Sequence, residues 1–302
     1  MVRLRENKYT IDSNKNILLS FIITLFSAFL FKFLHRVGVI IFFITKFHNK
    51  EMAQSTIDTI IKGDLGLQAI FYLGVALLFL FITYLFLNIV EKGKFSIFNI
   101  DYKLTKENKI LLLYFTITII TFKVITYFSS DILGLVDINF IGFSKFLVGE
   151  IIGFTLFISI ISSIKALCEE IYFRYFILDR TKKYKGERIG VLFTSSLFSL
   201  LYGLIYFKLN LEILTLFILA LFIGYIYLKT NSLFLTIGIH AIWLFTEGLI
   251  KGKGIFFSNE GIFILKNINK FGPLLLTFFD IITILLLILI FKNREFIKGQ
   301  LH

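Results

Sequence analysis

Long apolar blocks, separated by short polar and charged stretches, dominate the hydrophobic pattern of this chain. A membrane-spanning helix needs about 20 consecutive, mostly apolar residues, and blocks of that length recur from one end of the sequence to the other. The pattern therefore predicts an all-α fold, a polytopic membrane helical bundle with about eight transmembrane helices. The predicted spans cover residues 17–46, 67–90, 110–127, 141–167, 189–207, 211–228, 233–250 and 274–291.

Two of these spans are longer than one upright helix requires. The first, residues 17–46, contains charged side chains, so we expect it to be tilted, or else broken near Gly38. The fourth, residues 141–167, runs on without a Pro or Gly break through Glu169 toward Asp179. A long helix with acidic residues inside it is therefore expected in the middle of the chain.

Composition supports the membrane assignment. Hydrophobic residues make up 57% and charged residues 17% of the 302 positions, and the mean hydropathy is +0.85. Soluble globular proteins instead carry roughly 45–50% apolar and about 25% charged residues, so a soluble enzyme and a disordered tail are excluded. The single cysteine, Cys168, permits no internal disulfide and no cysteine metal cluster.

The formal net charge of +12 comes from basic residues that lie mainly between the predicted spans. With the N-terminus inside, the inner segments hold more than twice as many Lys and Arg residues as the outer ones, as the positive-inside rule requires. We therefore expect a multi-pass protein of the cell membrane with both termini in the cytoplasm, in contact with membrane lipids and without a nucleic-acid partner. No linker or repeat divides the chain, so residues 1–302 are expected to form a single integral-membrane domain.

The densest group of ionisable residues within a predicted span begins at Lys165 and continues through Glu169 and Glu170 to Arg174. Glu170 and Arg174 are four residues apart, so they share a helical face and are expected to pair. Glu169 is rotated by about 100° from Glu170, which leaves it without an obvious cationic partner and able to act as a general base. The alternative is that both glutamates lie at the cytoplasmic interface and solvate the end of the helix.

These residues resemble a known motif. The pattern Glu-Glu-x-x-x-Arg, formed by Glu169, Glu170 and Arg174, is similar to the first motif of the CPBP intramembrane proteases, which include the type II CAAX prenyl endopeptidases and the Abi proteins. Downstream, residues 216–245 resemble the glycine-containing helix, short turn and histidine-bearing helix of that family, with His240 in place. The similarity covers residues 156–249, about a third of the chain.

The resemblance implies four positions around a membrane-embedded site: a glutamate, a histidine in an FxxxH motif, a second histidine and an asparagine four residues after it. Glu169 and His240 occupy the first and third positions. The FxxxH position begins at Phe198 and ends at Tyr202 instead of histidine, and Leu244 stands at the asparagine position. Two of the four positions therefore depart from the pattern.

The roles implied by the resemblance are those of a hydrolase, an intramembrane endopeptidase acting on a membrane protein or peptide substrate. Glu169 would take a proton from water, and Glu170 and Arg174 would form a paired scaffold. His240 and Tyr202 would orient the water or stabilise the oxyanion. Since the loss of one such donor typically costs about 100- to 1000-fold in rate, the two departures bear directly on activity.

A metalloprotease would need three protein ligands and an open coordination position. Only Glu169, Glu170 and His240 are available, and a glutamate already paired with Arg174 is a poor ligand. A divalent metal stays open as a cofactor, but the remaining ligands do not support it.

Two further hypotheses stand beside the protease. Tyr202 and Leu244 favour a catalytically inactive family member, a membrane scaffold that binds a peptide or partner helix. A secondary transporter would account for buried charges, but the sequence shows no inverted repeat. Glu247, two turns after His240, could compensate for a missing polar group or reach the outer interface.

Overall fold

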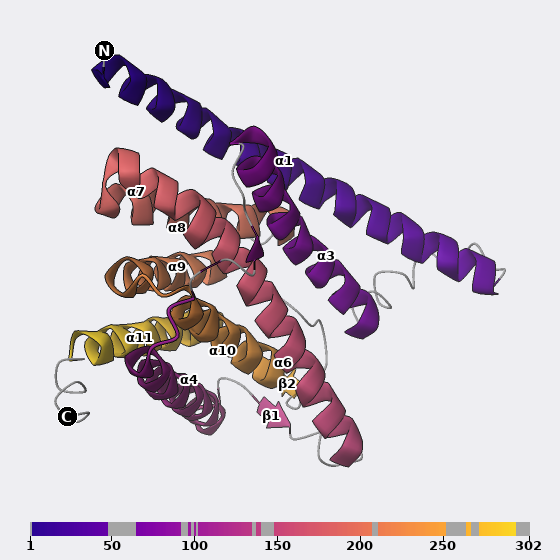
Figure 1. The fold of residues 1–302 in the computed structure, drawn as a ribbon. Coiled ribbons are helices and arrows are strands. Elements are labelled where there is room, and N and C mark those ends of the chain that lie inside the picture. The colour runs from indigo at the N-terminus through magenta and orange to yellow at the C-terminus, as the bar shows by residue number, and fades with distance from the viewer. Residues whose placement is uncertain are drawn as a thin grey trace.

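The computed structural model describes most of the chain: residues 2–47, 65–91, 96–97, 100, 102–134, 137–139, 148–206, 211–251, 264–266 and 272–293. These segments are helical almost throughout, which confirms the all-α bundle (Figure 1). All eight predicted spans are helices over the residues described, while positions 141–147 and 207 lie outside the described residues.

Eleven helical segments and two short strands make up the part of the chain that the structure describes. The α-helices are α1 (Val2–Phe47), α3 (Leu65–Tyr84), α4 (Lys106–Ile132), α6 (Val148–Glu170), α7 (Asp179–Lys185), α8 (Glu187–Tyr206), α9 (Leu211–Thr230), α10 (Leu233–Lys251) and α11 (Gly272–Lys292). Two π-helical segments continue α3 and α6, namely η1 (Leu85–Val90) and η3 (Ile171–Leu178). The strands β1 (Asp137–Asn139) and β2 (Ile264–Lys266) form an antiparallel pair with Ile138 opposite Leu265.

Helix length and composition make this a multi-pass membrane protein. Among the described residues, six helical stretches are long and apolar enough to cross a membrane: Lys15–Ile41, Ile70–Val90, Lys106–Ile132, Ile151–Lys185, Glu187–Ile205 and Leu211–Thr230. A shorter apolar helix covers Leu233–Leu249. Large apolar side chains lie exposed on the outer helix faces, Phe26 and Phe81 among them, as contact with lipid requires.

Helix α1 is continuous from Val2 to Phe47 and passes through Gly38 without interruption. Its 46 residues extend about 69 Å at 1.5 Å per residue, more than twice the roughly 30 Å of a bilayer core. The alternative of a break near Gly38 is therefore wrong, and the tilt of this helix stays a prediction.

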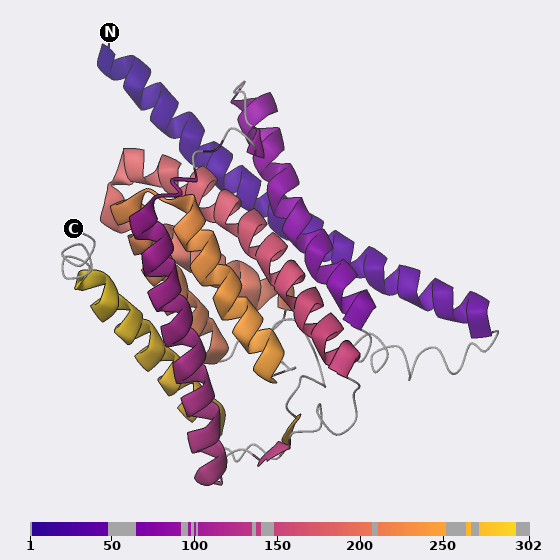
Figure 2. The ribbon, with the colours of Figure 1, turned by 60° about the horizontal axis from the view of Figure 1, so that its bottom comes forward.

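The helices form a bundle with a central group and two flanks (Figures 1 and 2). Helices α1 and α3 pack together on one flank, and α4 and α11 on the other. Between them lie α6, α8, α9 and α10, with α10 packed along α6 and α8 along α9. The helices that carry the candidate residues are thus the innermost ones.

Aromatic side chains fill the space beside this central group. One apolar cluster joins α3, η3 and α8 through Phe79, Phe173 and Phe198, whose rings meet with centroids 5.7 and 5.0 Å apart. A second cluster joins α4, α9 and α10 through residues that include Phe115 and Trp243. Ring pairs at these separations add to the stabilisation that apolar burial provides.

Two tight turns set the directions of α8 and α10. Gly186, with φ of +83°, reverses the chain between α7 and α8, a conformation that favours glycine. Asn231 has φ of +50° between α9 and α10, and asparagine tolerates this region better than most residues. Ser232 follows it and caps α10, since its Oγ accepts a hydrogen bond from the backbone N–H of Leu235 at 3.3 Å. The cap fixes the start of the helix that carries His240.

Candidate active site

The two adjacent glutamates stand where the backbone hydrogen bonding changes. Glu169 and Glu170 are the last residues of α6, and the chain continues directly into the π-helical segment η3. At the end of η3 the backbone N–H of Asp179 donates to the carbonyl of Arg174, five residues earlier. The continuous helix through the glutamates is as predicted, but the sequence pattern did not reveal its π-helical part. Such segments occur frequently at functional sites.

Glu170 makes the ion pair that its spacing predicts and adds a second contact. Its Oε2 lies 3.2 Å from Arg174 Nε, and its Oε1 lies 2.9 Å from His240 Nδ1. All three side chains are buried, with exposures of 1% or less. Arg174 also donates from Nη2 to the carbonyl of Ala220 in α9, at 3.4 Å. Glu170 and Arg174 thereby fix the imidazole ring against the end of α6.

Glu169 has partners of its own, so the expectation that it lacks a cation is wrong. Lys165, one turn earlier on α6, places Nζ 3.0 Å from Glu169 Oε1. The hydroxyl of Tyr202 on α8 donates to the same carboxylate and lies 2.7 Å from each of its oxygens. Lys165 Nζ in turn donates to that hydroxyl. The sequence places Lys165 within the same charged group, but its spacing of four residues from Glu169 was not used to pair them.

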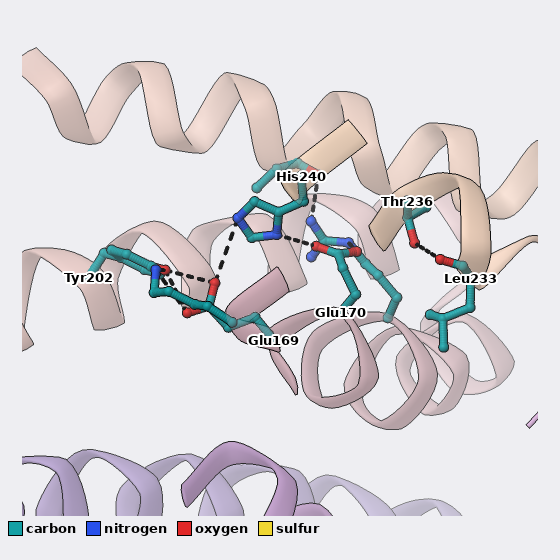
Figure 3. Close-up of polar contacts among 9 residues, drawn as sticks. Glu169, Glu170, Tyr202, Leu233, Thr236 and His240 are labelled. Atoms are coloured by element: carbon teal, nitrogen blue, oxygen red, sulfur yellow. Dashed lines mark hydrogen bonds and ion pairs between the residues drawn. The ribbon is translucent and has the colours of Figure 1, made fainter. Parts of the chain in front are cut away.

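The two halves of the site meet at His240 (Figure 3). Its ring lies between the glutamates, with Nε2 3.6 Å from Glu169 Oε2 and Nδ1 hydrogen-bonded to Glu170. Because a carboxylate accepts hydrogen bonds and cannot donate them, the proton of the neutral imidazole lies on Nδ1. Nε2 then presents its lone pair toward Glu169. Two proton acceptors therefore face each other from α10 and α6.

The charges of this group balance. Lys165 and Arg174 compensate Glu169 and Glu170 one for one when His240 is neutral. Charged side chains inside a membrane helix cost a few kcal/mol each and persist only with partners, so the pairing explains how four such groups are buried together.

Apolar side chains enclose the network on the sides nearest His240. The ring of Phe198 meets the imidazole edge to face, with centroids 5.7 Å apart, and lies 5.8 Å from the Arg174 guanidinium. Leu244, at the position where the resembled family has asparagine, packs with Ile158 and Ile161 of α6. The departure at Leu244 thus places an apolar contact between α10 and α6.

The candidate ligands do not fit a divalent cation in this arrangement. Lys165 and Arg174 each hold a positive group against one of the two carboxylates, where it would repel a metal ion. Across the part of the chain that the structure describes, no group of three or more His, Cys, Asp or Glu side chains could hold a metal ion. A metal-dependent step does not follow from these residues.

Glu247 belongs to a second buried ionic cluster. Lys123 of α4 donates to Glu247 of α10 and to Asp280 of α11, and its ammonium lies 4.2 Å from the centre of the Trp243 ring. Lys123 is 1% exposed. The structure thus pairs Glu247 with a lysine from another helix, and Asp280, which the sequence analysis did not single out, completes the cluster.

Residues 151–246 match a protein-family model described as Rce1-like, type II CAAX prenyl endopeptidase. The matched segment runs from the start of the α6 span to α10 and contains every residue of the network around His240. The resemblance predicted from the motifs is therefore confirmed over about a third of the 302-residue chain. Neither the curated proteins nor the solved structures contain a significant match to this chain.

Proposed function

We propose that this chain, which carries an Rce1-like segment at residues 151–246, is an intramembrane endopeptidase that hydrolyses peptide bonds with a water molecule activated by Glu169. One observation carries the proposal. The buried carboxylate of Glu169 faces Nε2 of His240 at 3.6 Å, and Glu170 and Arg174 hold the imidazole in the orientation that directs Nε2 there.

The proposed reaction uses Glu169 Oε2 as the base. A carboxylate oxygen has two lone pairs, so Oε2 can accept from Tyr202 and still take a proton from water. The oxygen of the water attacks the carbonyl carbon of the scissile bond. Once Glu169 has taken the proton from the water, the single O–H of Tyr202 turns from that carboxyl group to the developing oxyanion and donates a hydrogen bond to it. His240 Nε2 accepts a hydrogen bond from the same water and orients it. Glu169 then returns the proton to the leaving amine as the C–N bond breaks.

The substrate we propose is a membrane protein or a lipid-embedded peptide. All of the groups involved are buried among helices that are long and apolar enough to cross a membrane. A peptide segment that reaches them has to enter from the bilayer or from its interface. We further propose a location in the cell membrane with both termini in the cytoplasm, as the distribution of Lys and Arg between spans favours.

The test compares protein termini in cells that express the wild-type chain, no chain, Glu169→Gln or Glu247→Gln. Glu247→Gln is the matched control, because it also neutralises a carboxylate on a central helix, 14% exposed, but lies in the other cluster. We expect a set of membrane-protein termini to disappear both in the deletion and in Glu169→Gln, and to persist in Glu247→Gln. These termini are measured by mass spectrometry of isolated membranes, with every variant expressed at the same level as the wild type.

A non-catalytic scaffold is the second candidate, and one observation favours it. Tyr202 and Lys165 already satisfy the Glu169 carboxylate, and Leu244 supplies no polar group. In that case Glu169→Gln would behave as the wild type, and only the deletion would change the abundance of a partner protein. Termini lost on Glu169→Gln at normal expression would contradict the scaffold.

A further inference from the structure

Lys165 touches both Glu169 and Tyr202, the residue at the FxxxH position. Its side chain is fully buried on α6. Nζ lies 3.0 Å from Glu169 Oε1, donates to the Tyr202 hydroxyl, and stands 4.4 Å from the centre of the Tyr202 ring. One ammonium therefore contacts two of the groups that the proposed reaction uses.

Charge compensation alone does not account for this geometry. A partner for Glu169 needs only the contact to Oε1, which the spacing of four residues on α6 supplies. The second contact makes the hydroxyl of Tyr202 an acceptor from Lys165 while it donates to Glu169. A hydroxyl that accepts from a cation becomes a stronger donor, because successive hydrogen bonds polarise one another.

The same contacts determine which oxygen of the Glu169 carboxylate is available to act as the base. Oε1 of Glu169 is held by both Lys165 and Tyr202. Oε2 accepts from Tyr202 and faces His240 Nε2 at 3.6 Å, beyond hydrogen-bond distance. Tyr202 contacts both oxygens, and the contact to Lys165 distinguishes Oε1, so that Oε2 is the oxygen that faces the histidine.

We propose that Lys165 is a positioning residue of this site, which holds the Tyr202 hydroxyl and Glu169 Oε1 so that Oε2 faces His240. The proposal rests on the proposed function, because it assigns Lys165 a part in the same reaction. Lys165 acts through Tyr202 and Glu169 and touches no reacting atom.

The chain offers a matched control for this lysine. Lys123 is also a lysine within a membrane-spanning helix, α4; it is 1% exposed and paired with carboxylates. Its partners, Glu247 and Asp280, take no part in the proposed reaction. Lys123→Met therefore removes a comparable buried cation without changing the network around His240.

The experiment measures kcat and KM of purified protein in detergent micelles, on a peptide whose cleavage depends on Glu169. We expect Lys165→Met to lower kcat about 100-fold with KM nearly unchanged, and Tyr202→Phe to lower it by a similar factor. The double variant should fall little below either single variant, because residues that act as a unit are not additive. Lys123→Met should retain the wild-type kcat per folded molecule.

A second comparison separates positioning from a structural role. Tyr202→His supplies a donor that does not depend on the ammonium, so Lys165→Met should cost less than about 10-fold in that background. A folded Lys165→Met protein with the wild-type kcat would overturn the proposal. So would an equal loss in both backgrounds, since Lys165 would then act independently of residue 202.

If the proposed function is wrong, the role of Lys165 is tested by protein stability instead of by cleavage. If the wild-type protein cleaves no peptide, the proposed function fails, and thermal unfolding in micelles decides whether Lys165 positions Tyr202. We then expect the shifts of the unfolding midpoint for Lys165→Met and Tyr202→Phe to be non-additive, and those for Lys165→Met and Lys123→Met to be additive. Additive shifts in the first pair would overturn the positioning role.

Discussion

Two ionic clusters share α10, with Glu247 two turns after His240, and the buried charges are paired differently in each. Around His240, two cations serve two carboxylates one for one, and a histidine stands between the acids. Around Lys123, one cation serves two carboxylates that come from two other helices. The first cluster is built mainly on the junction of α6 and η3, whereas the second ties α4, α10 and α11 together.

The two clusters also differ in the kinds of proton-accepting group that they contain. The Lys123 cluster contains one cation and two carboxylates, which together connect α4, α10 and α11. The His240 cluster adds a second type of proton acceptor, Nε2, directed at a carboxylate oxygen. Buried ionisable groups in a membrane helix are functional candidates by default, and this difference is the reason we propose the His240 cluster as the reactive site.

The largest expected effects come from removing one cation from each cluster. Arg174→Met leaves Glu170 without its cation, and Lys123→Met leaves two buried carboxylates without one. Each should lower the free energy of unfolding by about 3–5 kcal/mol, with Lys123→Met at the upper end. Unfolding titrations in mixed micelles measure both.

Neutralising a cation together with its carboxylate partners then distinguishes the two clusters. Arg174→Met with Glu170→Gln should recover most of the stability but none of the cleavage, since the imidazole loses its orientation. The corresponding neutralisation of Lys123 and its two carboxylates should recover both. Cleavage at the wild-type rate in the Arg174 and Glu170 double variant would erase the distinction between the clusters.

A smaller effect is expected from changing the histidine alone. His240→Gln keeps a polar group of similar length but replaces the basic ring nitrogen that faces Glu169 Oε2 with an amide, which is not basic. We expect a fall in kcat of about 100- to 1000-fold, with an unfolding midpoint near that of the wild type. Steady-state cleavage and thermal unfolding on the same preparation check this, and unchanged kcat would show that His240 only packs against Phe198.

The smallest effect is expected at an ion pair outside both clusters. Arg180 of α7 donates to Glu91 after η1, with side chains 19% and 26% exposed. Because water reaches both groups, Arg180→Gln should cost no more than about 1 kcal/mol of unfolding free energy. If Arg180→Gln lowered the free energy of unfolding as much as Lys123→Met does, burial would not explain why the ion pairs of the two clusters stabilise the protein.

The fold followed from sequence because lipid imposes long apolar helices. All eight spans appear as helices, and the helix through Glu169 toward Asp179 is continuous. The failure at Gly38 has a simple cause: a glycine inside a helix costs only about 1 kcal/mol, which 46 residues of helical hydrogen bonding overcome. The π-helical form of η3 was not predictable from periodicity, because it depends on packing against α3 and α8.

The sequence predicted which residues belong to the site, but it did not predict all of the contacts between them. The spacing of Glu170 and Arg174 on one helix fixed their contact in advance. Tyr202 and His240 come from α8 and α10, so their distances to the glutamates depend on helix packing that spacing does not contain. Lys165 is a different case: it lies four residues before Glu169, the same spacing that joins Glu170 to Arg174, so its contact with Glu169 was predictable from the sequence.

Hydrolysis by the purified protein tests the central role of Glu169 most directly. Wild-type, Glu169→Gln and Glu247→Gln proteins would be incubated in ¹⁸O-labelled water with a peptide that spans a cleavage site whose new terminus is lost in the deletion strain. The masses of the products would then be measured by mass spectrometry. The account predicts one labelled oxygen in the new carboxyl group, formed at similar rates by the wild type and Glu247→Gln and at least about 1000-fold more slowly by Glu169→Gln. Labelled product formed by Glu169→Gln at the wild-type rate would contradict it.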